Sequence, residues 1–182
     1  GTLPRSGIRR LTDQVMGNQG MDDAIQLGFG QPQEATDDLI RVAIINATGE
    51  RTLGYTENAG LRTLRDAIVT KLAVRNHIET DIESIFVTPG ATYGVAVTIG
   101  CLINPGDEVL VPDPGYPNFA AAVRHYGGVV KFYPLREETG FLPDLNELTA
   151  LISPSTKVLI INSPGNPTGA VIDAGMMEQL VR

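Results

Sequence analysis

Apolar and polar residues follow two different periodicities along the chain. Five short runs rich in β-branched or aromatic residues predict β-strands. These runs are residues 25–29, 84–88, 108–111, 129–133 and 157–162. Segments that place apolar residues three or four positions apart instead predict helices. The helical segments are residues 36–48, 60–75, 92–103, 118–126 and 145–152.

The alternation of strands and helices predicts an α/β fold with a largely parallel sheet and flanking helices. Sheets of this kind bind their ligands at the carboxyl ends of the strands, so the loops that follow strands are the first candidates for a site. We expect the first part of the chain, which is more polar, to form an amino-terminal arm.

Two of the predicted helices differ in character. Segment 60–75 combines an apolar stripe with a charged flank, on which Arg65 is expected to lie, as in an ordinary amphipathic helix. Segment 92–103 carries no charge and contains small residues such as Gly94 and Gly100. We therefore expect this helix to be buried, with Cys101 in the core.

Composition narrows the class of protein. The 182 residues are 42% hydrophobic and 19% charged, which suits a globular fold. The net charge of −7 and the lack of a basic run argue against nucleic-acid binding. The longest uncharged apolar stretch, residues 95–103, is far shorter than the ~20 residues of a membrane span, and no secretory signal is evident at the amino end. With a single cysteine, the chain is expected to be soluble and cytoplasmic.

Most signatures of catalysis or metal binding are missing. The chain has no Gly-x-Ser-x-Gly, His-Glu-x-x-His or Cys-x-x-Cys motif and no P-loop. His77 and His125 follow or end predicted helices, where a surface role is expected. We expect no metal site.

Three loops combine strand ends with turn-forming residues. Gly90-Ala91-Thr92 leads from a strand into the uncharged helix, where backbone N–H groups and the helix dipole favour a phosphate. Tyr116 lies in a loop dense in Pro and Gly and offers a flat surface on which a ring can stack. Asn166 lies in the third loop, residues 161–169, and its amide can both donate and accept hydrogen bonds.

Taken in order, several segments resemble the class I and II aminotransferases, which are fold-type I pyridoxal phosphate enzymes. The resemblance covers nearly the whole chain, and the ordered combination carries it rather than any one motif. Its segments are Ile8-Arg9-Arg10-Leu11, Leu27-Gly28-Phe29-Gly30-Gln31-Pro32, Tyr55 with Gly60-Leu61-Arg62-Thr63-Leu64-Arg65, Pro105-Gly106-Asp107-Glu108-Val109, Pro114-Gly115-Tyr116-Pro117 and Asn166-Pro167-Thr168-Gly169.

The resemblance implies a role for each candidate residue and for the cofactor, pyridoxal 5'-phosphate. Gly90, Ala91 and Thr92 resemble the family's phosphate-binding residues, and Tyr116 resembles the aromatic residue that stacks on the pyridine ring. Asn166 resembles the asparagine that hydrogen-bonds the phenolic oxygen of the cofactor. The resemblance also implies cis peptide bonds at Asp113-Pro114 and Asn166-Pro167.

Two further residues take roles from the resemblance alone. Tyr55 resembles the tyrosine that reaches the cofactor phosphate of the neighbouring subunit, which implies a homodimer. Gly30 corresponds to the glycine close to the substrate carboxylate. In domain terms, residues 1–35 are expected to form the arm or small-domain segment, and residues 36–182 the first, incomplete part of the large cofactor-binding domain.

The catalytic residues of the family lie beyond the segments that match. The Schiff-base lysine, the aspartate that pairs with the pyridine nitrogen and the carboxylate-binding arginine all follow the Asn-Pro-Thr-Gly loop in the family. None of Lys71, Lys131 and Lys157 matches that lysine. The chain is therefore expected to be the amino-terminal part of an aminotransferase that moves an amino group between an amino acid and a 2-oxo acid, and to be inactive alone.

Three alternatives remain open. A lyase or synthase of the same fold is one, and a non-catalytic regulator or partner protein that keeps the fold is another. A short protein that completes its site with a second polypeptide is the third. The substrate amino acid is not determined by these residues.

Overall fold

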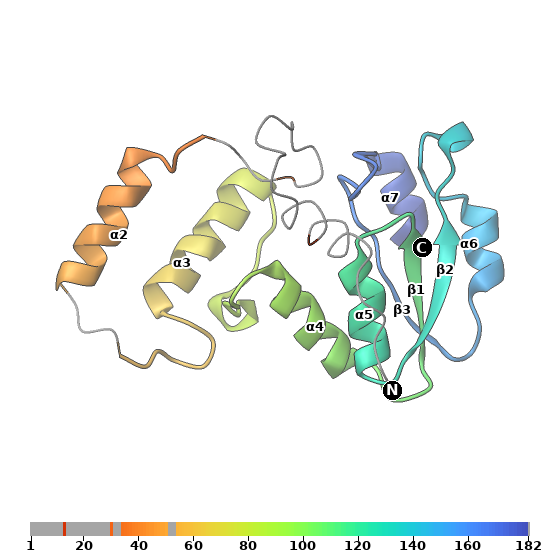
Figure 1. Cartoon of the computed structure of the whole chain (residues 1–182), viewed down its shortest axis with the longest axis horizontal. Helices are drawn as coiled ribbons and strands as arrows, with labels where there is room; N and C mark the ends of the chain where they lie inside the picture. The colour runs from red at the N-terminus through yellow and green to blue at the C-terminus, as the bar shows by residue number, and fades with distance from the viewer. Residues whose placement is uncertain (1–12, 14–29, 31–33, 51–53, 182) are drawn as a thin grey trace. The chain divides into compact units, whose positions relative to one another are not determined.

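The computed structural model describes residue 13, residue 30 and residues 34–50 and 54–181 of the chain (Figure 1). The chain forms two compact units, divided after Thr88. We call them the amino-terminal unit and the carboxyl-terminal unit. The predicted arm, residues 1–35, lies almost wholly outside the described residues, as does the strand predicted at 25–29, and both stay predictions.

The described part of the amino-terminal unit is helical. Helix α2 spans Asp38–Glu50 and helix α3 spans Arg62–Lys71. Their ends differ by two to four residues from those of the predicted helices, 36–48 and 60–75. A π-helical turn, Leu72–Asn76, extends α3 and ends at His77, whose φ of 56° is left-handed. A short 3-10 helix, Ile82–Ser84, then leads toward the end of the unit.

The strand predicted at residues 84–88 is wrong for this chain. Residues 82–84 are helical and residues 85–88 are assigned to no strand. Ile85 has extended backbone angles, and the N–H of Val87 donates to the carbonyl of Ala59 over 2.9 Å. A β-strand requires a ladder of such bonds to a neighbour. The bond made by Val87 is a single contact rather than a ladder, so the β-branched sequence of this segment does not become a strand.

The carboxyl-terminal unit holds a three-stranded parallel sheet, as predicted. Strand β1 spans Glu108–Asp113, β2 spans Val129–Pro134 and β3 spans Thr156–Leu159. The strand order is β2-β1-β3, and β1 pairs with both neighbours in parallel. The helices are α4, Ala91–Leu102; α5, Pro117–His125; α6, Leu145–Leu151; and α7, Ala174–Val181, of which α7 was not predicted.

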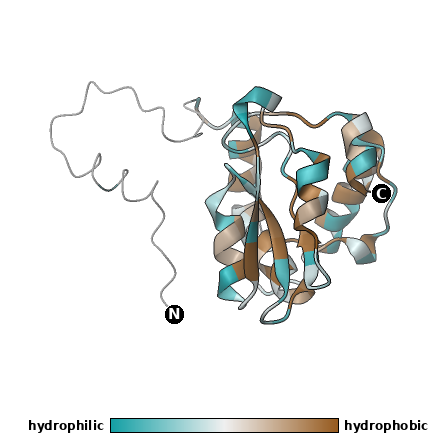
Figure 2. Ribbon diagram, turned by 90° about the vertical axis from the view of Figure 1, so that its right-hand side faces the viewer, coloured by the Kyte–Doolittle hydropathy of each residue, from teal (hydrophilic) through white to brown (hydrophobic). Residues whose placement is uncertain are grey.

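Alternate residues of the central strand face two separate cores. Val109 and Val111 pack on one face, while Leu110 packs on the other, as the two-residue period of a strand requires. The strands are accordingly mostly hydrophobic (Figure 2). The first core adds residues of α4 and α5, and the second adds residues of β2, α6 and α7. The sheet is therefore covered on both faces, which places its strand ends and their loops at the accessible edge.

Helix α4 is mostly exposed, contrary to the prediction that it would be buried. Ile99 is its one fully buried residue, while Tyr93 and Leu102 are both 54% exposed. Cys101 is exposed rather than part of the core. A helix without charged residues can be buried on any of its faces. A face is buried, however, only where another segment packs against it. Within the described chain α4 packs chiefly on one side, against α5 and the sheet.

No helix among the described residues is both long and apolar enough to cross a membrane.

Candidate functional site

The start of helix α4 forms the first part of the candidate site. Gly90 precedes the helix with a φ of 86°, a left-handed conformation that favours glycine. No side chain caps this helix. The N–H groups of a helix's first turn have no carbonyl partner within the helix, and they lie at the positive end of its dipole. After the turn at Gly90, Ala91 and Thr92 thus offer first-turn N–H groups of the kind that an anion requires.

Tyr116 is held at the end of β1 by a compact loop. The Asp113-Pro114 bond is cis, as the resemblance implied. Gly115 packs so tightly on Pro112 that a Cβ there would lie 2.4 Å from the Pro112 carbonyl oxygen. The ring of Tyr116 is partly buried and meets the edge of the Phe119 ring, with centroids 5.5 Å apart. The aromatic ring is therefore fixed, with packing on one side.

Two hydroxyl groups join the loop to the helix. The Thr92 Oγ1 and Tyr116 hydroxyl oxygens lie 3.2 Å apart, within hydrogen-bond distance. The side-chain amide of Asn118 also donates to the Tyr116 hydroxyl, over 2.7 Å. The residues predicted for phosphate binding and for ring stacking are thus neighbours, although they come from different elements. Their ligand-binding roles stay predictions.

Asn166 is presented by a rigid loop after β3. Its backbone N–H donates to Oδ1 of Asn162 over 2.9 Å, and Gly165 donates to the carbonyl of Ala170 over 2.8 Å. The Asn166-Pro167 bond is cis, as implied, and so is Ser163-Pro164, which was not anticipated. Asn166 itself is exposed, and its side-chain amide makes no hydrogen bond to another residue that the structure describes. That amide is available to a ligand.

A shallow hollow, open to solvent, lies beside the loops that follow β1 and β3. Its polar lining comes mainly from Asn162, Asn166 and Thr168. Its other lining residues are Pro112, Pro114, Tyr133, Leu135, Phe141, Pro143, Gly165, Ala170 and Ile172. Tyr133 uses its hydroxyl to donate to the Ile160 carbonyl over 2.7 Å, and burial raises its pKa to about 12. It therefore acts as a neutral structural residue at ordinary pH.

Sequence comparison identifies the family. The family model for class I and II aminotransferases matches residues 22–182. The chain belongs to this family. It is 38% identical over 171 residues to an aspartate aminotransferase of Pyrococcus horikoshii, covering 94% of this chain and 43% of that protein. It is also 38% identical over 165 residues to an LL-diaminopimelate aminotransferase of Desulforudis audaxviator, covering 90% of this chain and 42% of that protein.

The fold agrees with the family. The chain superposes on a mutant aspartate aminotransferase of Thermus thermophilus with a TM-score of 0.90 and 30% identity, covering 99% of this chain and 47% of that one. The parallel sheet and flanking helices are thus those of a fold-type I aminotransferase. The chain spans less than half the length of each of these proteins.

Tyr55 and Gly30 belong to the amino-terminal unit. Tyr55 is fully exposed, in a loop that precedes α3. Gly30 is exposed too, and among the described residues no atom lies within 4 Å of a Cβ placed there. Both family-derived roles stay predictions.

Each of the three lysines either forms a polar contact with another side chain or is exposed to solvent. Lys131 lies in β2, but its ammonium is 2.9 Å from the Glu108 carboxylate at the first residue of β1, near the opposite end of the sheet from the site loops. Lys71 donates to the side chain of Asn76 over 2.7 Å, and Lys157 is exposed. Within the carboxyl-terminal unit, Lys131 is therefore held away from the loops that carry Tyr116 and Asn166.

Sequence reasoning missed two residues that shape the site regions. The Asn162 side chain accepts a hydrogen bond from the backbone of Asn166. Its position at the start of the turn-rich loop could have indicated this role. Arg65 was expected on the charged flank of its helix, whereas it is the one buried charged residue among those described, 5% exposed. The spacing of apolar residues could not predict this burial, because such a pattern assigns every arginine to the solvent-facing side of a helix.

Proposed function

We propose that this chain is the amino-terminal part of a pyridoxal 5'-phosphate-dependent aminotransferase, which transfers an amino group between an amino acid and a 2-oxo acid. Family membership supports the class of reaction. The observation that carries the proposal to this chain's own residues is the 3.2 Å approach of the Thr92 and Tyr116 hydroxyls. This contact places a helix start that can bind a phosphate next to an aromatic ring on which a flat ligand can stack.

The residues present fit the cofactor. A phosphate is suited to the uncapped first turn of α4, where Gly90 has the left-handed conformation and Thr92 adds a hydroxyl. The ring of Tyr116 is held rigidly enough to stack on a flat heterocycle without a large loss of side-chain freedom. The amide of Asn166 would donate to an anionic ring oxygen, which favours the charged form of that oxygen.

When bound, the cofactor supplies the electron sink that lets an amino group move between carbon skeletons. The residues of this chain bind and orient it. The Thr92 hydroxyl and the first-turn N–H groups hold the phosphate, Tyr116 fixes the plane of the ring, and Asn166 sets the charge of its oxygen. The Schiff-base lysine is proposed to lie outside this chain.

The proposal includes a homodimer in the cytoplasm. The full exposure of Tyr55 supports a role toward a second copy of the chain, whose cofactor phosphate it would reach. The single cysteine is in keeping with a reducing compartment. Amino acids and 2-oxo acids are the proposed substrates.

The test uses the protein made from the full reading frame that contains this chain. The purified protein should show the visible absorbance of bound pyridoxal phosphate and transfer amino groups from at least one acidic, aromatic or aliphatic donor to a 2-oxo acid. Bound cofactor with release of ammonia or carbon dioxide would indicate the lyase alternative. Bound cofactor without turnover of any donor would indicate a regulator, and no binding would contradict the proposal.

A further inference from the structure

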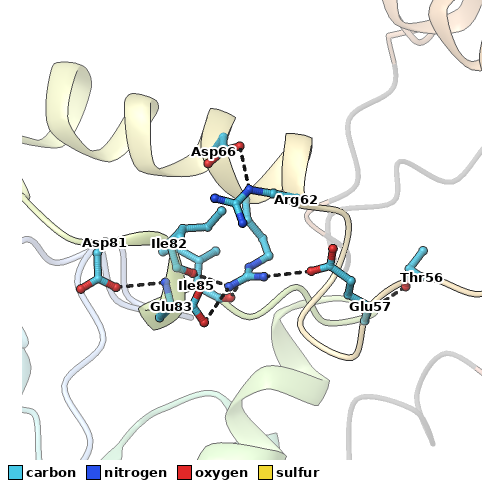
Figure 3. A network of polar contacts seen from close by, with 9 residues as sticks. Thr56, Glu57, Arg62, Asp66, Asp81, Ile82, Glu83 and Ile85 are labelled. Atoms are coloured by element: carbon cyan, nitrogen blue, oxygen red, sulfur yellow. Dashed lines mark hydrogen bonds and ion pairs between the residues drawn. The ribbon is translucent and has the colours of Figure 1, made fainter.

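Arg65 is a buried cation in the amino-terminal unit. Figure 3 shows the segments that supply its acceptors, labelled at Glu57, Ile82 and Ile85. The Arg65 side chain is 7% exposed, although it comes from the middle of α3. Removing a guanidinium from water is costly unless its N–H groups find acceptors. The acceptors around Arg65 therefore show what this residue holds together.

Two backbone carbonyls fix one side of the guanidinium. Nη2 donates to the carbonyl of Ile82 over 2.7 Å, and Nε donates to the carbonyl of Ile85 over 3.1 Å. Both carbonyls belong to the segment that leads along the chain toward Gly90. Arg65 is thereby anchored in α3 and in this segment at once.

The remaining side of the guanidinium reaches the loop that carries Tyr55. Nη1 donates to Oε2 of Glu57 over 3.3 Å. Glu57 lies two residues after Tyr55, and its carbonyl accepts from the N–H of Gly60, which closes a turn. The ion pair therefore holds the loop immediately beside Tyr55.

A second contact fixes the far end of the same loop. The carbonyl of Ala59 accepts from the N–H of Val87 over 2.9 Å. Gly60 follows with a φ of 101°, and a Cβ there would lie 2.7 Å from Val87. The loop is thus pinned at Glu57 and at Ala59-Gly60, while Tyr55 itself is fully exposed. The contacts therefore hold the loop directly after Tyr55 and leave Tyr55 itself uncovered.

We propose that Arg65, acting through Glu57, is a positioning residue that holds the Tyr55 loop in the conformation needed to bind the cofactor phosphate of a second copy of the chain. The inference rests on the proposed function, because Tyr55 must meet a phosphate for its position to matter. Arg65 touches neither substrate nor cofactor in this proposal. Its effect is exerted through the ion pair and the turn.

Glu83 supplies a matched control. Its carboxylate also faces the Arg65 guanidinium, at 3.7 Å, but it lies in the 3-10 helix and not in the Tyr55 loop. Glu57 and Glu83 are 61% and 80% exposed, so neither alanine variant empties a core. The two substitutions each remove one carboxylate near the same cation and differ in which segment they release.

The measurement is the dissociation constant of pyridoxal phosphate, determined spectroscopically on the dimer made from the full reading frame. Glu57→Ala should raise this constant about two- to fivefold, the range of a partly exposed ion pair. Glu83→Ala should leave it unchanged, and Arg65→Lys, which loses the forked geometry, should raise it at least as much as Glu57→Ala. Equal effects of Glu57→Ala and Glu83→Ala would overturn the proposal.

A double-mutant cycle separates positioning from general destabilisation. Tyr55→Phe should weaken cofactor binding, and adding Glu57→Ala to it should then have no further effect, because the hydroxyl being positioned is gone. Independent, multiplying effects would overturn the role of Arg65 and Glu57 while leaving the proposed function in place. If Tyr55→Phe binds cofactor like the unsubstituted protein, Tyr55 does not contact the phosphate and the inference fails. An unsubstituted protein that binds no cofactor contradicts the proposed function itself.

Discussion

The hydroxyl oxygens of Thr92 and Tyr116 lie 3.2 Å apart, although 24 residues separate them in the chain. Helix α4 and the loop after β1 converge at this point. The contact combines backbone donors at a helix start with an aromatic ring, and it requires both elements to pack on the same sheet. The site residues in the carboxyl-terminal unit therefore depend on the β1 core as much as on their own loops.

Removing the Thr92 hydroxyl should weaken cofactor binding. Thr92→Val keeps the shape of the side chain but loses the oxygen beside Tyr116, so we expect the dissociation constant of pyridoxal phosphate to rise about three- to tenfold in the full-length protein, the worth of roughly one hydrogen bond. Thr98→Val is the control, because Thr98 is exposed in the middle of the same helix. An equal response of the two variants would argue against phosphate binding at Thr92.

The hydroxyl of Tyr133 should contribute to stability. Tyr133→Phe leaves the Ile160 carbonyl without its donor, and we expect a loss of about 1–2 kcal/mol in the free energy of unfolding. Tyr126→Phe serves as the control, since Tyr126 is 37% exposed. Denaturant titration followed by circular dichroism measures both. No difference between the variants would show that the buried bond is not formed in solution.

Tyr133 should also make stability depend on alkaline pH. Burial raises its pKa from 10.0 in the unfolded chain to about 12 in the fold. Its contribution is therefore complete below pH 10 and is lost as the pH rises toward about 12, because the unfolded chain ionises first. Alkaline unfolding should be less steep in this range for Tyr133→Phe. A profile identical to that of the unsubstituted chain would contradict this linkage.

Glu108 should make stability depend on acid. The pKa of the Glu108 carboxyl is lowered, chiefly by a hydrogen bond from Ser153 and next by the contact with Lys131. The ionised form is thus favoured in the fold, so its contribution is present above the unfolded pKa and is lost as the pH falls through the lowered folded pKa. Ser153→Ala should move the midpoint of acid unfolding to higher pH, whereas Ser155→Ala should not. Acid titration followed by circular dichroism decides between them.

Gly115 should be required for the Tyr116 loop. A methyl group there would lie 2.4 Å from the carbonyl oxygen of Pro112, and the loop must shift to accept it. Gly115→Ala should cost about 1–3 kcal/mol and weaken cofactor binding in the full-length protein. Gly175→Ala is the control, because its Cβ would make an ordinary contact of 3.5 Å with Asp173. Thermal unfolding measures the stability of both variants, and we expect a loss for Gly115→Ala alone. Equal stability of the two variants would contradict the prediction.

The 182-residue chain by itself should form no stoichiometric Schiff base with pyridoxal phosphate. Lys131 is paired with Glu108, while Lys71 and Lys157 are exposed, so no lysine is held in a buried site that would favour the neutral amine. Incubation with the cofactor, reduction with borohydride and peptide mass spectrometry test this expectation. Complete labelling of one lysine, together with amino-donor turnover, would place a catalytic lysine within the chain.

The site could be predicted in part because some of its features are local. The glycine before α4 and the turn-forming residues around Tyr116 and Asn166 are readable from the sequence, since turns depend on the residues that make them. The bond between Asn162 and Asn166 spans four residues and shares that locality. The approach of Thr92 to Tyr116 was not readable, because it depends on how α4 and β1 pack.

The sequence by itself determined the order of strands and helices from β1 to β3, the parallel sheet and the family. Periodicity and turn residues act over a few positions, so one chain is enough to read them. Only the tertiary structure decided that Arg65 is buried, that residues 85–88 form no strand and that most of α4 is exposed. Each of these depends on whether a distant segment supplies acceptors, a neighbouring strand or a packing surface, and such partners leave no mark on local spacing.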